Sequence, residues 1–125
     1  MLTGSRIGLC VDTGHLMVGG VDPVALAASH TARVTHVHLK DVDAELAEAV
    51  LSGRLAFGDA VRAGIFRPLG EGDVDIAALV RVLEESGYQG WYVLEQDVML
   101  DAAPEGEGPM QDVRRCLAFL AKAVA

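Results

Sequence analysis

The feature that most constrains the fold of this chain is an alternation of short, β-branched apolar runs with longer helical ones. Three runs have the length and composition of strands: residues 6–12, 33–41 and 90–97. The segments with helical patterning are 21–34, 44–64, 76–87 and 111–125. Strands that alternate with helices pair in parallel, because the intervening helix carries the chain back to the same end of the sheet. The sequence therefore predicts an α/β fold of parallel strands covered by helices.

Helix-start and helix-stop residues sharpen this prediction. Asp22 followed by Pro23 is typical of a helix N-cap and first turn, and Gly87 is placed to end the helix before it. Gly53 and Gly58 predict either one broken helix or two short ones in the segment 44–64. Two polar stretches rich in Gly and Pro, 66–75 and 103–109, are predicted loops. We expect one domain over residues 1–125.

The charge balance limits the classes of partner. The chain of 125 residues has 18 acidic against 10 basic side chains and a formal net charge of −8. Nucleic acids and anionic membranes are bound by clustered Lys and Arg, so neither is an expected partner. No apolar run approaches the roughly 20 residues that cross a membrane, and no signal peptide is evident. Cys10 and Cys116 lie far apart in the sequence, which favours free thiols and a cytoplasmic location.

The C-terminal ends of the three predicted strands carry groups that can bind a metal. Side chains two apart on a strand share a face, so His36, His38 and Lys40 are expected on one face. The same alternation brings Asp12 and Glu95 to the ends of their strands. In parallel α/β folds this edge of the sheet is where sites are built. Two carboxylates and one imidazole form a hard donor set, which favours Mn²⁺, Mg²⁺ or Co²⁺ over structural zinc.

Each of these residues also has a purely structural interpretation. An aspartate at a strand end is commonly a helix cap or a turn former, and this holds for Asp12. A histidine in an apolar strand is more often a satisfied core residue, which is the interpretation we adopt for His36. A carboxylate at Glu95, after an apolar run, would be buried and would need a cation, a proton or a partner. Lys40 is expected to form an ion pair with a neighbouring carboxylate.

Three segments together resemble one protein superfamily. They are "GLCVDTGHLMVGGVDPVAL", "VTHVHLKDV" and "FRPLGEGDVDIAALVRVLEESGYQGWYVLEQD". They resemble the second half of the sugar isomerase and epimerase barrels of the xylose isomerase-like superfamily, and the similarity runs from about Ile7 to Leu120. The segment 44–75 is similar to the branch that handles inososes, which includes isomerases and dehydratases. The resemblance implies half of a (β/α)₈ barrel, roughly its strands 5–8, with a divalent cation (Mn²⁺, Co²⁺ or Mg²⁺) at the C-terminal mouth.

The resemblance also implies roles for individual residues. Asp12, His38 and Glu95 match metal ligands, and Glu95 additionally matches a catalytic acid or base. His15, in the Asp-Thr-Gly-His turn, matches a contact to a substrate oxygen and is the second candidate catalytic residue. Lys40, on the face of His38, is a further candidate for binding a substrate hydroxyl.

Arg67 completes the set of candidate substrate-binding residues and lies in the segment 44–75. The expected substrate is a small keto-sugar or an inosose. The expected chemistry is proton abstraction next to a carbonyl to give an enediolate, which leads to isomerisation or epimerisation. Dehydration of an inosose is the alternative outcome of the same intermediate.

The length of the chain departs from the superfamily. A complete barrel takes about 250 residues, and the fourth ligand of the superfamily, a glutamate on an earlier strand, has no counterpart here. We therefore expect a truncated or partial barrel that associates as a homo-oligomer or with a missing N-terminal half, because its outer strands have unpaired edges. A non-catalytic half-barrel is the corresponding alternative.

Two other interpretations are weaker. An enzyme of the apurinic endonuclease type shares the barrel, but it would need more metal ligands and a basic surface. A phosphate site at "LGEGDVD" would use backbone N–H groups at a helix start, but Asp73 and Asp75 would repel the anion.

Overall fold

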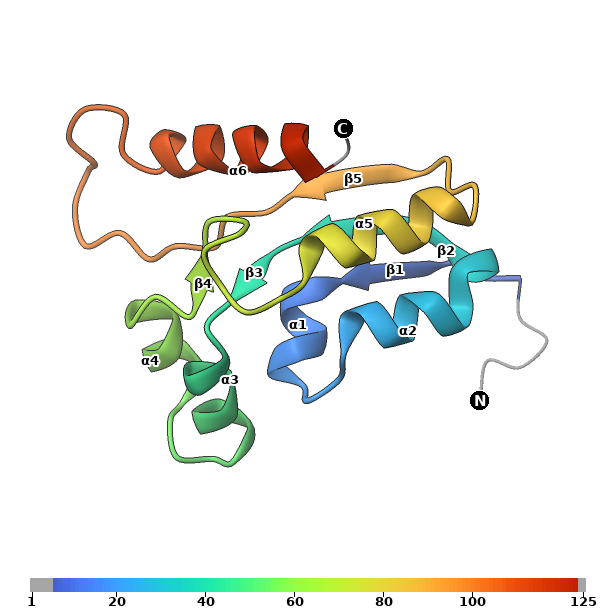
Figure 1. The fold of residues 1–125 in the computed structure, drawn as a ribbon. Coiled ribbons are helices and arrows are strands. Elements are labelled where there is room, and N and C mark those ends of the chain that lie inside the picture. Colours follow the sequence, from blue (N-terminus) through green and yellow to red (C-terminus); the bar gives the residue numbers. More distant parts are fainter. Residues whose placement is uncertain (1–5, 124–125) are drawn as a thin grey trace.

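A three-stranded parallel sheet lies at the centre of the structure (Figure 1). The computed structural model describes residues 6–123. The strands are β1 (Leu9–Asp12), β2 (Val34–Leu39) and β5 (Trp91–Leu94), in the order β1-β2-β5. Both pairings are parallel, and they confirm the arrangement predicted from the alternation of strands and helices.

Within the described residues, six α-helices connect and flank these strands. They are α1 (Thr13–Val18), α2 (Pro23–His30), α3 (Ala44–Leu51), α4 (Phe57–Arg62), α5 (Ile76–Glu85) and α6 (Met110–Ala123), and a 3₁₀ turn, η1 (Thr31–Arg33), follows α2. Asp22 caps α2, as predicted, by accepting hydrogen bonds from the N–H groups of Val24 and Ala25. The segment 44–64 forms two short helices, one of the two predicted alternatives. Residues 124–125 of the predicted last helix lie outside the described residues.

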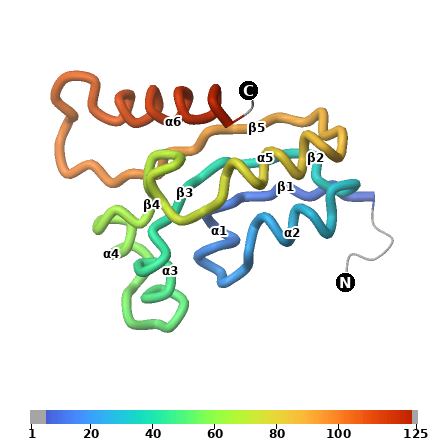
Figure 2. The backbone as a smooth tube through the Cα atoms, in the orientation of Figure 1, coloured from blue at the N-terminus to red at the C-terminus, as the bar shows by residue number. Residues whose placement is uncertain are grey.

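The core lies between one face of the sheet and the helices α2 and α5. Val11, Val37 and Leu39 point to this face and are almost fully buried. Their burial follows from the strand alternation, and they meet Leu79 and Leu83 in the core cluster. Helices α2 and α5 lie side by side across this face (Figure 2). Each such side chain contributes about 1.5–3 kcal/mol by leaving water.

Two features of the fold depart from the sequence-based prediction. The Asp-Thr-Gly-His segment, residues 12–15, was expected to form a turn, but it caps and begins the short helix α1. Within the predicted loop 66–75, β4 (Phe66–Arg67) pairs antiparallel with β3 (Asp41–Val42), directly after β2. Two-residue strands carry too little periodicity to be recognised in a sequence.

The opposite face of the sheet is open among the described residues. Cys10, His36 and Trp91 are in register across the three strands on this face. Trp91 is 77% exposed, and Ile7, which precedes β1, is 66% exposed. The strands of the described residues form an open three-stranded sheet and a separate two-stranded one, and they close no barrel. Their helices include none that is long and apolar enough to cross a membrane.

Candidate metal and substrate site

Three side chains from neighbouring strand ends converge at one edge of the sheet. Asp12 and His38 are register partners on β1 and β2, and Glu95 follows the last residue of β5. The N–H of Glu95 still donates to the carbonyl of Leu39, so the residue is held beside β2. Asp12, His38 and Glu95 each offer one ligand atom, and these atoms lie within 4.8 Å of one another. All three side chains are partly exposed, so the site is open to solvent.

His38 lies between the two carboxylates. Its Nδ1 is 2.9 Å from Oε1 of Glu95 and 3.6 Å from Oδ2 of Asp12. The side chain of Glu95 is half-buried, less than its apolar surroundings in the sequence suggested, because the face of the sheet beside it is open. The structure thus brings together the three residues that the sequence analysis selected as metal ligands.

Asp12 has two structural roles at once. Its Oδ1 accepts a hydrogen bond of 2.9 Å from the N–H of His15, which caps helix α1. Its Oδ2 faces His38. The helix-cap interpretation is therefore correct, and it leaves the second carboxylate oxygen available to a ligand. The cap also fixes the carboxylate, since N-cap geometry holds the side chain in one orientation.

Lys40 is the most deeply buried charged residue of the cluster. Its side chain is 2% exposed, and Nζ lies 2.8 Å from Oε2 of Glu95 and 2.7 Å from Oδ2 of Asp97. A third carboxylate, Asp12, is 3.5 Å away. Burial acts to lower the pKa of Lys40, but its hydrogen bonds to Asp97 and Glu95, together with the charges of Asp12 and Asp97, outweigh burial and leave the pKa raised. The predicted ion pair with neighbouring carboxylates is present, and Lys40 remains charged at neutral pH.

Helix α1 fixes the backbone and stem of Lys40. The hydroxyl of Thr13, which is fully buried, donates to the carbonyl of Lys40 at 2.6 Å and accepts from its N–H at 2.8 Å. Gly14 lies against the stem, where an added Cβ would be 2.6 Å from Cδ of Lys40. Within the Asp-Thr-Gly-His sequence, Asp12 therefore caps helix α1, Thr13 binds the backbone of Lys40, and Gly14 leaves room for the stem of Lys40.

His15 lies at the mouth of the cluster, with its side chain 56% exposed. Its Nε2 is 3.3 Å from Nζ of Lys40 and 3.8 Å from Oδ2 of Asp12. The ring packs beside Phe57 of α4 and edge-on to Phe66 of β4, at centroid distances of 6.4 and 6.3 Å. A substrate at the strand ends would therefore meet an imidazole with aromatic rings beside it.

Arg67 lies outside this group. Phe66 faces Lys40, whose Nζ is 5.1 Å from the ring centroid, so its neighbour on β4 points to the other side. The guanidinium of Arg67 pairs instead with Asp43, and Nη2 and Oδ2 are 2.9 Å apart. This hydrogen bond is the main reason that the pKa of Asp43 is lowered. Substrate binding by Arg67 stays a prediction.

His36 lies two residues before His38 on the same face of β2, and the two rings meet edge to face at 5.2 Å. It is half-buried, less than expected for a core histidine, because it lies on the open face. Cys10 shares this face, and burial and then the charges of Asp12 and Glu95 raise the pKa of its thiol. Both Cys10 and Cys116 are free, as predicted.

Sequence reasoning missed two aspartates of this region. Asp97 lies beyond the end of β5, so strand alternation does not place it, although its spacing of two from Glu95 was a usable signal. Asp41 is fully buried and points away from the cluster. Its carboxylate accepts four backbone hydrogen bonds, from Val42, Gly70, Gly72 and Val74. Asp41 thereby fixes the segment 69–74 next to the sheet edge.

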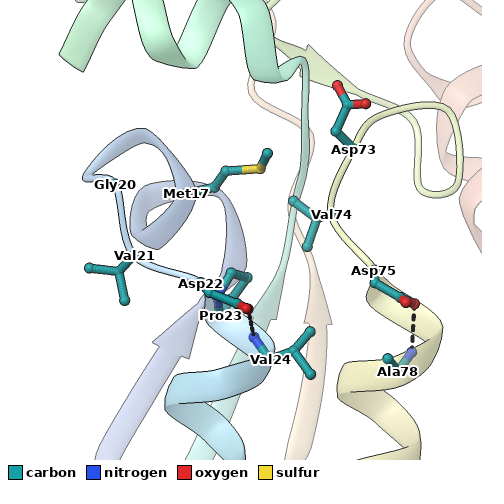
Figure 3. Close-up of a pocket in the computed structure, with 10 residues that line it drawn as sticks. All are labelled: Met17, Gly20, Val21, Asp22, Pro23, Val24, Asp73, Val74, Asp75 and Ala78. Carbon is teal, nitrogen blue, oxygen red and sulfur yellow. Dashed lines mark hydrogen bonds between the residues drawn. The ribbon is translucent and has the colours of Figure 1, made fainter. Parts of the chain in front are cut away.

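A pocket of about 520 Å³ lies between the turn after α1 and the start of α5 (Figure 3). None of the residues of the strand-end cluster lines it. Its three aspartates each accept a backbone hydrogen bond: Asp22 from Val24, Asp73 from Ala44 and Asp75 from Ala78. These contacts are made to N–H groups at the starts of helices, so the acidic residues of the pocket are explained by helix capping and no ligand is needed to explain them.

The donor set of the strand-end cluster fits a hard divalent cation. Asp12 and Glu95 supply oxygen and His38 supplies nitrogen, and no cysteine belongs to the group. Mn²⁺, Co²⁺ and Mg²⁺ accept such mixed sets with the remaining positions open to water or substrate.

Comparisons with known proteins show which family and which relatives the chain is similar to. The family described as xylose isomerase-like TIM barrel matches residues 2–122. The chain is 45% identical over 96 residues to the rhizopine catabolism protein MocC of Rhizobium meliloti, which covers 77% of this chain and 30% of that protein. It is 39% identical over 92 residues to inosose dehydratase of Geobacillus thermodenitrificans (strain NG80-2), covering 74% of this chain and 31% of that enzyme.

Solved structures share the fold. A D-tagatose 3-epimerase-like protein aligns with a TM-score of 0.61 at 18% identity, over 94% of this chain and 34% of that one. A xylose isomerase domain protein from Alicyclobacillus acidocaldarius aligns with a TM-score of 0.56 at 24% identity, over 96% of this chain and 38% of that one. The chain thus spans about a third of the length of these proteins, and it matches the C-terminal part of its relatives.

Proposed function

The chain belongs to the xylose isomerase-like TIM barrel family, and from this premise we propose that it carries part of a divalent-metal-dependent site that isomerises or epimerises a small keto-sugar or a cyclitol ketone. The observation that carries the proposal is the convergence of Asp12, His38 and Glu95, whose ligand atoms lie within 4.8 Å of one another. Names of relatives support the substrate class, since they include an inosose dehydratase and a D-tagatose 3-epimerase-like protein.

The proposed role of each residue follows from the position of its side chain. A bound divalent cation supplies Lewis acidity toward a carbonyl oxygen. Glu95 is the proposed general base, because its carboxylate is held at the strand end by Lys40 and faces the open mouth. General-base catalysis of this kind contributes about 10²–10⁴ in rate. His15 and Lys40 bind and orient the substrate oxygens, and Arg67 is a more distant candidate for a second contact.

The product depends on where Glu95 delivers the proton that it has taken from the substrate. Its return to the opposite face of the same carbon gives epimerisation, and its delivery to the neighbouring carbon gives isomerisation. Departure of a β-hydroxyl gives dehydration instead. Dehydration is the second candidate function, and the similarity to inosose dehydratase specifically favours it.

The site is completed from outside the 125 residues in this proposal. β1 and β5 are the outer strands of the sheet, and Trp91 is exposed on its open face. Exposed strand edges favour association, so we expect a second copy or a separate N-terminal half-barrel to complete the barrel, in the cytoplasm. Light scattering checks this association: a stable, monodisperse monomer would contradict it. A half-barrel that associates but binds no cation would fit the non-catalytic alternative.

Metal binding is the direct test of the site. We expect the chain to bind Mn²⁺, measured by the loss of the free-ion signal in electron paramagnetic resonance. His38→Ala should abolish this binding, while His30→Ala, which changes an exposed histidine at the end of α2, should leave it unchanged. Binding that persists in the His38 variant would contradict the proposed ligand set.

Proton abstraction is tested separately. The associated protein is incubated with an inosose or a ketohexose in D₂O containing Mn²⁺, and deuterium uptake next to the carbonyl is followed by NMR. We expect exchange that Glu95→Gln abolishes without changing the circular dichroism spectrum. Near-normal exchange by that variant would exclude Glu95 as the base. The product then distinguishes isomerisation, epimerisation and dehydration.

A further inference from the structure

Three carboxylates surround one buried ammonium group at the edge of the sheet. Asp97 and Glu95 lie 2.7 and 2.8 Å from Nζ of Lys40, and Asp12 lies 3.5 Å away. Asp12 and Glu95 are two of the three proposed metal ligands, and Asp97 is outside that group. Lys40 therefore contacts the same carboxylates that a divalent cation would bind.

We infer that Lys40 is a built-in counter-cation that competes with a divalent metal for Glu95 and Asp12, and that Asp97 weakens this competition by holding the ammonium at the outer side of the cluster. The inference rests on the proposed metal site and adds two residues that control its affinity. Neither residue is a metal ligand in this scheme. Both are positioning residues.

The surroundings of Lys40 keep its ammonium at the cluster. The stem is 2% exposed, it passes Gly14, and the Thr13 hydroxyl binds both backbone groups of the residue. An ammonium without a counter-charge is costly in such a position, so Nζ must keep at least one carboxylate partner.

Asp97 is suited to be that remaining partner. Its contact to Nζ is the shortest of the three, and its side chain is 49% exposed, on the solvent side of the group. When Glu95 and Asp12 turn to a divalent ion, the hydrogen bond to Asp97 still neutralises Lys40. Without Asp97, Lys40 would have Glu95 as its one remaining hydrogen-bonded carboxylate, and metal binding would then leave the ammonium unpaired.

The two residues should consequently change metal affinity in opposite directions. Lys40→Met keeps the apolar stem and removes the competing charge, so Mn²⁺ should bind about tenfold more tightly. In Asp97→Asn the ammonium of Lys40 keeps Glu95 as its hydrogen-bonded carboxylate and competes more strongly for it, so Mn²⁺ should bind several-fold more weakly. In the double variant the Asp97 substitution should have little effect, since Asp97 has no ammonium left to hold.

The double variant separates this mechanism from simple charge effects. If Asp97 acted only by adding negative charge near the ion, Asp97→Asn would weaken binding equally with and without Lys40. Matched controls are Arg33→Met, before β2, and Glu85→Gln, at the end of α5. Both lie toward the opposite end of the sheet, and we expect less than a twofold change from either.

The experiment titrates the metal-free 125-residue chain with Mn²⁺ at low ionic strength and pH 7 and measures the free ion by electron paramagnetic resonance. Circular dichroism checks that each variant is folded, and Lys40→Gln, which removes the charge but keeps a polar end group beside the carboxylates, replaces Lys40→Met in both backgrounds if Lys40→Met unfolds. Unchanged or weaker binding by folded Lys40→Met, or an equal Asp97 effect in both backgrounds, overturns the inference. If wild-type protein binds Mn²⁺ and His38→Ala does not, the proposed function survives that result. If wild-type protein binds no Mn²⁺, both fail.

Discussion

Replacement of Asp41 by asparagine is the sharpest test of how the edge of the sheet is held. Oδ1 of Asp41 accepts from the N–H groups of Val42 and Val74, and Oδ2 accepts from those of Gly70 and Gly72. The side chain is completely buried. In Asp41→Asn the amide oxygen can keep the first pair of hydrogen bonds, but the NH₂ group then faces two N–H donors.

The expected cost follows from the second pair. Each hydrogen bond to a charged group is worth about 1.5–3 kcal/mol, and a buried N–H without a partner carries a desolvation penalty. The neutral amide is cheaper to bury than a carboxylate, which offsets part of this loss. We therefore expect the free energy of unfolding to fall by about 3 kcal/mol. With a urea m-value of about 1.5 kcal/mol/M, the unfolding midpoint moves down by about 2 M.

Urea denaturation followed by circular dichroism measures this change. Asp75→Asn is the matched control, because Asp75 is an exposed N-cap that accepts from Ala78, and asparagine caps helices about as well as aspartate. Its midpoint should stay close to that of the wild type. A loss below about 1 kcal/mol for Asp41→Asn, with an unchanged m-value, would refute the view that these hydrogen bonds hold segment 69–74.

Three further outcomes test the packing beside the cluster. Thr13→Val leaves the buried N–H and carbonyl of Lys40 without their hydroxyl partner, so urea denaturation should show a loss of about 2 kcal/mol. Gly14→Ala places a Cβ against the stem of Lys40 and should cost about 1–3 kcal/mol; an unchanged thermal midpoint would show that the stem moves freely. The hydrogen bond from Arg67 lowers the pKa of Asp43 in the folded protein below its ordinary value of 3.8. The ionised carboxylate of Asp43 therefore stabilises the fold above pH 3.8, and this stabilisation is lost as the pH falls through the lowered pKa of the folded protein. Arg67→Met should accordingly flatten the decline in unfolding midpoint between about pH 5 and about pH 2.

Strand alternation was sufficient to predict that the three candidate ligands lie together at one edge of the sheet. Asp12, His38 and Glu95 were selected because each closes an apolar strand, and parallel pairing brings such ends to one edge. The ion pairing of Lys40 followed from its place on the face of His38. These predictions needed only local periodicity and the direction of the strands.

Other parts of the site depend on contacts that local patterns encode weakly or not at all. Asp97 follows β5, where the direction of a side chain is set by the path of the loop. The hydrogen bonds of Asp41 join it to residues 29 to 33 positions away, apart from the one to its neighbour Val42. The position of Arg67 depends on a two-residue ladder, and a shift of one residue would have turned its side chain toward Lys40.

The open face of the sheet gives the protein an internal optical probe. Trp91 is the single tryptophan of the chain, and it stands in register with His36 on that uncovered face. Its indole fluorescence therefore arises from one place, and a shift of the emission to shorter wavelength, with protection from iodide quenching, would signal that another polypeptide has come to lie there. Assembly can thus be followed in dilute solution without a label, at concentrations where scattering is too weak to report it.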